Sequence, residues 1–301
     1  MKHFSIVKKA KVFFSISLIF LLVGVVSMLT RGFNIGFDFT GGSIIDVKFE
    51  NPVTVSEVRD VLSDHKLGSS IIQLGSMDGQ QTEESQSVLI RTGIISDDQR
   101  VETMTDMTNR LGPNEVLRVE NVGATVGRDL VKSAMGAVAL SWVLMIIYIT
   151  IRFEHNFAFA AIIALIIDVM VTLSWFSLLQ LEMDSSFVAA LLTVVGYSIN
   201  GTIVIFDRIR ENLHTHRRSE SLGDMVDNSI WQTMNRSIYT SATTLFAVIA
   251  IFLFGGETIR NFSFAMLVGF SSGFYTSTFL AGPLSVSYTH LRAHETPEHL
   301  V

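Results

Sequence analysis

Six long apolar runs, each about the length needed to cross a lipid bilayer, constrain this chain more than any other feature. They cover residues 12–30, 133–151, 157–181, 185–206, 237–256 and 262–284. A helix needs about 20 apolar residues to span hydrocarbon, where every backbone amide needs an internal partner. Only 17% of the residues are charged, against about 25% in soluble domains. We therefore expect a polytopic α-helical membrane protein with six transmembrane helices.

The basic residues of the short connecting segments predict its orientation in the cell membrane. The N-terminal stub carries four lysines and the loop 207–236 carries five arginines, whereas the loop near Glu182 has no basic residue. Both termini are therefore expected in the cytoplasm. The first apolar run has the basic start of a signal peptide, but no A-x-A cleavage site follows it, which favours a retained helix.

The segment 31–130 is too polar to span a membrane and is expected to fold outside it. Its periodicity predicts strands at 43–49, 70–74, 87–91 and 115–122, and helices at 55–65 and 97–111. Thr54 or Ser56 is expected to cap the first helix, with Glu57 placed to complete a capping box after Thr54. The order βαββαβ predicts an extracytoplasmic ferredoxin-like α+β domain between the first two membrane helices.

Nothing in this domain indicates catalysis or nucleic-acid binding. It carries sixteen acidic and nine basic residues, whereas phosphate binding needs clustered Lys and Arg. Its one histidine, His65, has no His or Cys nearby and is interpreted as a solvated surface residue. The chain has no cysteine, which excludes disulfides, thiolate catalysis and cysteine zinc sites.

Asp168 is the most informative residue, because it lies near the middle of the third apolar run. A carboxylate at the bilayer centre costs about 2.5–3.5 kcal/mol on insertion scales. Such a group serves either as a proton relay or as a hydrogen-bonded structural carboxyl between helices, and the sequence favours the relay. Ala161, Ala164 and Thr172 share its helical face, as expected of a face that packs against other helices.

Small and polar residues also share faces on the later spans and predict a polar interior path. These residues are Thr193, Gly196, Tyr197, Asn200 and Gly201 on the fourth span, Ser237, Ser241 and Thr244 on the fifth, and Gly269, Gly273 and Thr276 on the sixth. At the end of the fourth span, Arg208 and Arg210 are either solvated helix-end charges or partners that tune a carboxylate. The sequence leaves these two alternatives open.

The loop after the fourth span predicts a further helix. Ser221 and Asp224 are placed for a capping box, and Leu222, Met225 and Val226 begin an apolar face that continues to Met234. This pattern predicts a helix lying along the inner membrane surface. His214 and His216 lack further ligands and are interpreted as loop residues.

Five motifs in this order resemble the SecF family of SecD/SecF protein-export proteins, and the resemblance covers about residues 4–284. They are RGFNIGFDFTGG at 31–42, VGATVGRDL at 122–130, GYSIN at 196–200, IVIFDRIREN at 203–212 and RSIYTSATT at 236–244. The resemblance implies an auxiliary subunit that works with a SecD partner, a SecY-type channel and a SecA motor. It implies use of the proton motive force, without a cofactor, in late stages of export of unfolded preproteins.

The resemblance also implies residue roles. Asp168 is implied to carry protons, Asn200 to line the conduit, and Arg208 or Arg210 to supply the associated basic group. Gly201 stands where relatives often have an acidic residue. The chain thus divides into residues 1–30 with the first span, the external domain 31–130, the spans and loop of 131–284, and an atypical tail 285–301 that we expect to be non-native.

Three other function classes compete with this interpretation. A small-molecule exporter of the resistance-nodulation-division type shares the architecture, but such exporters usually have two large external domains per chain. A structural membrane scaffold would gain little from a buried carboxyl. An intramembrane enzyme is disfavoured, since the sequence has no paired Asp motif, no Ser/His pair and no H-E-x-x-H.

Overall fold

The computed structural model describes residues 4–75, 84–153, 155–214, 221–256 and 259–285. The chain forms two compact units. Residues 35–134 are called the α+β unit below, and residues 1–34 together with 135–301 are called the helical unit. Within these described ranges, six helices are long and apolar enough to cross a membrane. The fold class expected from the sequence, a polytopic helical protein with a small α+β domain, is confirmed. Residues 286–301 of the atypical tail and His216 lie outside the described residues.

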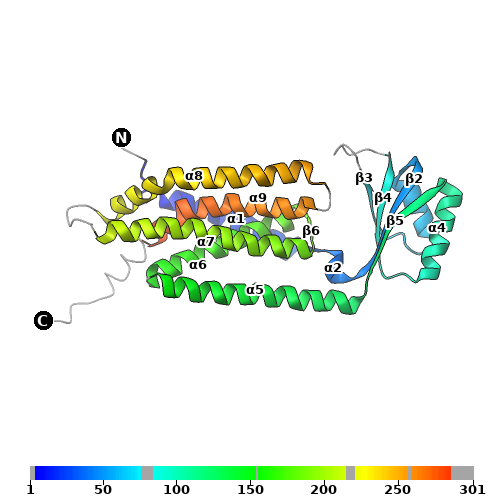
Figure 1. Ribbon diagram of the computed structural model, residues 1–301, viewed down its shortest axis with the longest axis horizontal. Coiled ribbons are helices and arrows are strands. Elements are labelled where there is room, and N and C mark those ends of the chain that lie inside the picture. The colour runs from blue at the N-terminus through cyan, green and yellow to red at the C-terminus, as the bar shows by residue number, and fades with distance from the viewer. Residues whose placement is uncertain (1–3, 76–83, 154, 215–220, 257–258, 286–301) are drawn as a thin grey trace. The chain divides into compact units, whose positions relative to one another are not determined.

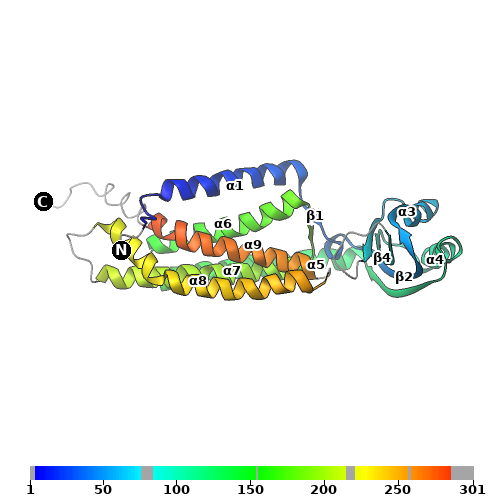
Figure 2. The same ribbon diagram turned by 90° about the horizontal axis from the view of Figure 1, so that it is seen from above.

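The α+β unit has the predicted order of elements. It contains α2 (Phe37–Thr40), β2 (Gly42–Thr54), α3 (Val55–Asp64), β3 (Ile71–Gly75), β4 (Glu84–Thr92), α4 (Asp97–Leu111) and β5 (Asn114–Val122), and β1 (Asn34–Ile35) precedes them. The antiparallel sheet has the ferredoxin-like strand order β3-β4-β2-β5. Figure 2 shows α3 and α4 on the same side of this sheet.

The alternation of side chains along β2 builds the core of this unit. Ile45, Val47 and Phe49 are almost fully buried, because successive strand residues point to opposite faces of a sheet. They pack in one cluster with Val58 of α3 and Met107 of α4. The apolar residues of the strands, spaced every second residue, and those of the helices, spaced every three to four residues, therefore pack in a single core.

His65 corrects one sequence interpretation. Its side chain is only 14% exposed, and its Nε2 lies 3.1 Å from Oδ2 of Asp106 on α4. The residue is therefore half-buried and hydrogen-bonded rather than solvated. The sequence pattern concealed this pair because its members are far apart in the chain.

The helical unit contains the membrane-length helices (Figure 1). They are α1 (Ala10–Arg31), α5 (Ala124–Arg152), which begins in the α+β unit, α6 (His155–Leu179), α7 (Ser185–His214), α8 (Leu222–Phe254) and α9 (Arg260–Tyr275), which continues as the π-helix η2 (Thr276–Ala281). The short strand β6 (Glu182–Met183) lies between α6 and α7.

Glycines allow the helices to approach one another closely. A Cβ on Gly269 of α9 would lie 2.2 Å from Cγ2 of Val194 on α7, and a Cβ on Gly24 of α1 would lie 1.9 Å from Oγ of Ser174 on α6. Membrane helices associate through such close packing, because lipid offers no hydrophobic driving force between them. The close contacts of α7 with α9 and of α1 with α6 are thus possible because glycine, which has no side chain, occupies positions 269 and 24.

The predicted helix along the membrane surface is wrong as a separate element. Residues 222–236 form the first turns of α8, which continues without a break into the fifth span. Ser221 caps this helix and accepts a hydrogen bond from Asp224 N. Met225, Val226 and Ile230 are buried in the core of the helical unit. The apolar face therefore packs against protein rather than lipid.

The N-terminal segment covers that face. Ile6 is fully buried in the same core. The carboxylate of Asp227 on α8 accepts hydrogen bonds from Ile6 N and Val7 N, each at 2.9 Å, and from the Ser5 hydroxyl. Trp231 Nε1 donates to the Phe4 carbonyl at 2.9 Å. These contacts, called the N-terminal clasp below, attach the start of the chain to α8.

A substitution test follows from the α7–α9 packing. We expect Gly269→Leu to destabilise the helical unit by about 1–3 kcal/mol, the usual cost of overpacking a filled core, because its side chain would collide with Val194. Gly136→Leu on α5 is the matched control, since a Cβ there meets nothing within 4 Å. Thermal unfolding of both purified variants in detergent measures the difference. Equal melting temperatures would contradict the close α7–α9 contact.

The capping box of α3 generates a pH test. The Thr54 backbone N–H and hydroxyl donate to Glu57 and hold the pKa of that carboxyl below its ordinary value of 4.5. A pKa that is lower in the folded state gives stability that is complete above the unfolded pKa and lost as pH falls through the folded one. We expect the urea midpoint of the unit 35–134 to fall with pH below about 4.5, and part of this fall to vanish in Glu57→Gln. An identical pH profile in both proteins would refute this role of the carboxyl.

Candidate functional site

The Asp168 carboxyl is fully buried in the middle of α6. Its Oδ1 accepts a hydrogen bond from Ser272 Oγ of α9 at 2.6 Å, and both of its oxygens lie 2.9 Å from Thr276 Oγ1 at the start of η2. The Ser198 hydroxyl of α7 donates to Oδ2. One acidic side chain therefore connects α6 to α7, α9 and η2.

Within the described chain, the Asp168 carboxyl accepts hydrogen bonds from neutral hydroxyls and forms no ion pair. Burial in a medium of low dielectric stabilises the neutral acid, whereas hydroxyl donors stabilise the carboxylate. These effects oppose one another, so both protonation states have support from their surroundings. Chemically, the arrangement is suited to taking up and releasing a proton.

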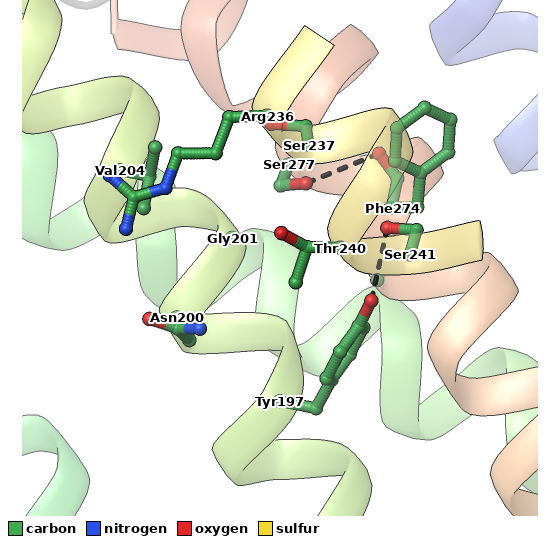
Figure 3. Close-up of a pocket in the computed structure, with 11 residues that line it drawn as sticks. Tyr197, Asn200, Gly201, Val204, Arg236, Ser237, Thr240, Ser241, Phe274 and Ser277 are labelled. Atoms are coloured by element: carbon green, nitrogen blue, oxygen red, sulfur yellow. Dashed lines mark hydrogen bonds between the residues drawn. The ribbon is translucent and has the colours of Figure 1, made fainter. Parts of the chain in front are cut away.

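A cavity of about 80 Å³ lies between α7, α8 and the last span. Tyr197 OH donates to Ser241 Oγ at 3.0 Å inside it, and Figure 3 shows this pair with Asn200 and Arg236 to its left. A cavity of this size has room for water, and the hydroxyl, amide and guanidinium groups among its largely apolar walls could bind it. Asp168 is not among its lining residues.

A thin wall separates this cavity from the Asp168 site. Gly273 and Ser277 line the cavity, while their neighbours in the helix, Ser272 and Thr276, contact the carboxyl. A Cβ on Gly273 would lie 3.2 Å from Cα and Cβ of Ser198. The cavity and the carboxyl thus lie on opposite sides of the same α7–α9 contact.

The structure brings together some of the residues that the sequence singled out. Tyr197, Asn200 and Ser241 line the cavity. Thr172 is buried next to Asp168, but its hydroxyl donates to the Asp168 backbone carbonyl at 2.9 Å rather than to the carboxyl. Thr244 is half-buried on α8 and donates to its own helix.

Other predicted residues lie elsewhere. Thr193 and Gly196 are exposed on the outer face of α7. Arg208 donates to Gln232 at 2.5 Å and to Glu211 at 2.6 Å, and Arg210 is exposed. Arg208 lies ten residues beyond Ser198 on α7, roughly 15 Å along the helix axis. The structure therefore does not bring either arginine to the buried carboxyl.

Sequence reasoning missed two of the three hydroxyls at the site, Ser198 and Ser272, and placed Thr276 in the polar interior path without pairing it with Asp168. The sequence did contain a sign of Ser198. This serine interrupts an otherwise apolar face of α7, which includes Val194 and Ile205 and is buried in the structure. The sequence analysis assigned the polar path to another face of α7, around Asn200, and that face is exposed in the structure. Both faces carry small polar residues, and only the neighbouring helices distinguish them.

Comparisons with known proteins agree on one family. Residues 102–291 match the family "Protein export membrane protein SecD/SecF, C-terminal", and residues 26–53 match the SecD/SecF GG motif. The chain is 78% identical over 284 residues to the protein translocase subunit SecF of Acidaminococcus fermentans, covering 94% of this chain and 97% of that relative. It is 42% identical to the SecF subunit of Sebaldella termitidis, covering 93% of this chain and 90% of that one.

The helical architecture is also found in solved structures. The chain is similar to SecDF from Thermus thermophilus, described as a translocon-associated membrane protein, with a TM-score of 0.84 and 31% identity over 95% of this chain. It spans 39% of that longer protein. A second form of SecDF, called super-membrane-facing, matches with a TM-score of 0.72. On this evidence the chain belongs to the SecF family of protein translocase subunits.

Proposed function

We propose that this subunit uses the proton motive force, together with a SecD partner, to promote late stages of preprotein export across the cytoplasmic membrane. Its further partners would be a SecY-type channel, a SecA motor and the unfolded preprotein, and it would need no cofactor. The observation that carries this proposal is the buried Asp168 carboxyl with its three hydroxyl donors on other elements.

Protonation of Asp168 would change how the helices are held together. The ionised carboxyl accepts from Ser198, Ser272 and Thr276, whereas a protonated acid is a weaker acceptor and brings a donor of its own. The three hydroxyls would then re-orient and the helices would repack. Such a change needs two packed states that differ by only a few kcal/mol.

Repacking in the membrane would be coupled to the external domain and so bias movement of the preprotein outward. In this proposal both termini lie in the cytoplasm, because the lysines that precede α1 and the arginines after α7 follow the positive-inside rule. Protons would then enter from the outer side and leave to the cytoplasm.

The SecD partner would cover the open polar face of α7 and α8. Thr193, Asn200, Arg236 and Thr240 are all exposed on these membrane-length helices. Polar side chains in hydrocarbon face other helices or a water-filled cavity rather than lipid. A second helical unit packed on this face would enclose the cavity beside the α7–α9 contact.

Replacing the carboxyl tests the proton role. We expect Asp168→Asn to reduce export of a secreted precursor to the level of cells depleted of the subunit, because Asn keeps the size and hydrogen bonding but cannot titrate. Pulse-chase labelling of the precursor measures this effect. Asp207→Asn, two turns before the end of α7 and paired with Arg152 at 3.0 Å, is the control for loss of a carboxylate. Normal export with Asp168→Asn would mean that the carboxyl is structural.

A bulky substitution tests the partner face. A Cβ on Gly196 meets nothing within 4 Å, so Gly196→Trp fits the isolated chain but would obstruct a helix packed on α7. We expect this variant to insert normally and to lose co-purification with SecD. Ile19→Trp on α1, at a position that is 63% exposed, should retain SecD. Co-purification of both variants would show that SecD binds elsewhere.

A further inference from the structure

The last span changes its helical type where it contacts Asp168. The α-helix α9 ends at Tyr275, and the six residues of η2 form a π-helix. The flanking residues Tyr275 and Gly282 keep ordinary helical dihedral angles. A π turn holds one more residue than an α turn, is rare, and occurs frequently at functional sites.

Thr276, the first residue of η2, has more acceptors than it can satisfy. Its hydroxyl lies 2.9 Å from both Asp168 oxygens and 3.3 Å from the Gly273 carbonyl of its own helix. A hydroxyl carries a single proton to donate. The shorter distances and the charge of an ionised carboxyl favour Asp168, whereas a neutral carboxyl would let the hydroxyl turn to Gly273.

Thr278 of η2 carries a buried hydroxyl whose hydrogen bonding is incomplete. Its side chain is 1% exposed, and its Oγ1 has no hydrogen-bond partner within the described chain. Buried polar groups in proteins are nearly always paired, and an exception calls for an explanation. A second backbone arrangement of η2, in which Thr278 turns toward a carbonyl, would supply the missing acceptor.

The far end of η2 contacts α1 and the N-terminal part of α8. Phe279 stacks on Phe13 of α1 with ring centroids 4.7 Å apart. A Cβ on Gly282 would lie 2.8 Å from Cδ1 of Ile230, which belongs to the core that also holds Ile6. A turn of η2 would therefore move the residues that pack against the N-terminal clasp.

We propose that η2 is a two-state segment whose helical type is set by the charge on Asp168. With the carboxyl ionised, Thr276 is held by Asp168 and the wide turn persists. With the carboxyl neutral, Thr276 bonds to its own helix, η2 tightens toward an α-helix, and Thr278 and Phe279 rotate by roughly 100°, one residue's worth of helical turn. This inference rests on the proposed proton role of Asp168 and adds the element that transmits its state to α1 and α8.

The absence of cysteine from the chain allows a direct test in the full-length protein. A single cysteine introduced as Thr278→Cys is alkylated by a small maleimide in membranes, with Asp168 intact or replaced by Asn. We expect several-fold faster labelling with Asp168→Asn, because the rotated side chain leaves its buried position. The matched control is Ser263→Cys, a position that is also 1% exposed on α9 but lies before η2, and its labelling rate should not change.

A second variant tests whether faster labelling comes from η2 itself rather than from a general destabilisation of the protein by Asp168→Asn. Thr276→Val keeps the carboxyl and the side-chain shape but removes the hydroxyl that connects η2 to Asp168. We expect it to accelerate labelling at Thr278→Cys in the same direction and again to leave Ser263→Cys unaffected. Equal labelling rates at Thr278→Cys in all three backgrounds would overturn the proposal, as would a parallel rise at both cysteines.

Export measured on the same strains separates this proposal from the proton role. If Asp168→Asn blocks export but leaves labelling at Thr278→Cys unchanged, Asp168 still carries protons and η2 is only a packing element. If Asp168→Asn exports normally, the proton role fails, and with it the proposal that rests on that role.

Discussion

The hydrogen bonds between one carboxyl and three hydroxyls organise the centre of the helical unit. Ser198, Ser272 and Thr276 come from segments that are at least 30 residues from Asp168 in the chain. In hydrocarbon none of these groups can turn to water instead. The contact therefore fixes the rotation of α6, α7 and α9 about their axes, and the small residues between these helices can then pack closely. The carboxyl that we propose to carry protons is therefore also a structural constraint on how these helices pack.

Hydropathy and periodicity were sufficient to predict the spans and the α+β domain. Helix α4 begins and ends at the predicted residues, and Thr54 caps α3 together with Glu57. These features depend on interactions between residues close in the chain, which a pattern records directly. The site itself depends on which face of α7 is turned inward, and a single helix with polar residues on both faces does not contain that information. Val194 and Ser198 face inward because Gly269 and Gly273 of α9 leave room for them.

The start of α8 shows the same limit in another form. An amphipathic helix has an apolar face whether that face meets a lipid surface or a protein groove, so the pattern alone predicted membrane contact. The deciding residue is Ile6, which packs onto this face from the other end of the sequence. The pair of His65 with Asp106 was hidden for the same reason. Interactions between distant segments leave little trace in local periodicity.

The N-terminal clasp has a consequence for the order in which the protein is assembled. The Ile6 amide donates to the carboxylate of Asp227, which lies 221 residues later in the chain and is therefore synthesised after it. Chains emerge at about 5–20 residues per second, so the beginning of the protein waits roughly ten seconds or longer for its binding site to be synthesised. During this interval Ile6 lacks the core that later buries it. The residues that precede the first span are thus synthesised early and reach their final contacts only after the start of α8 has been made.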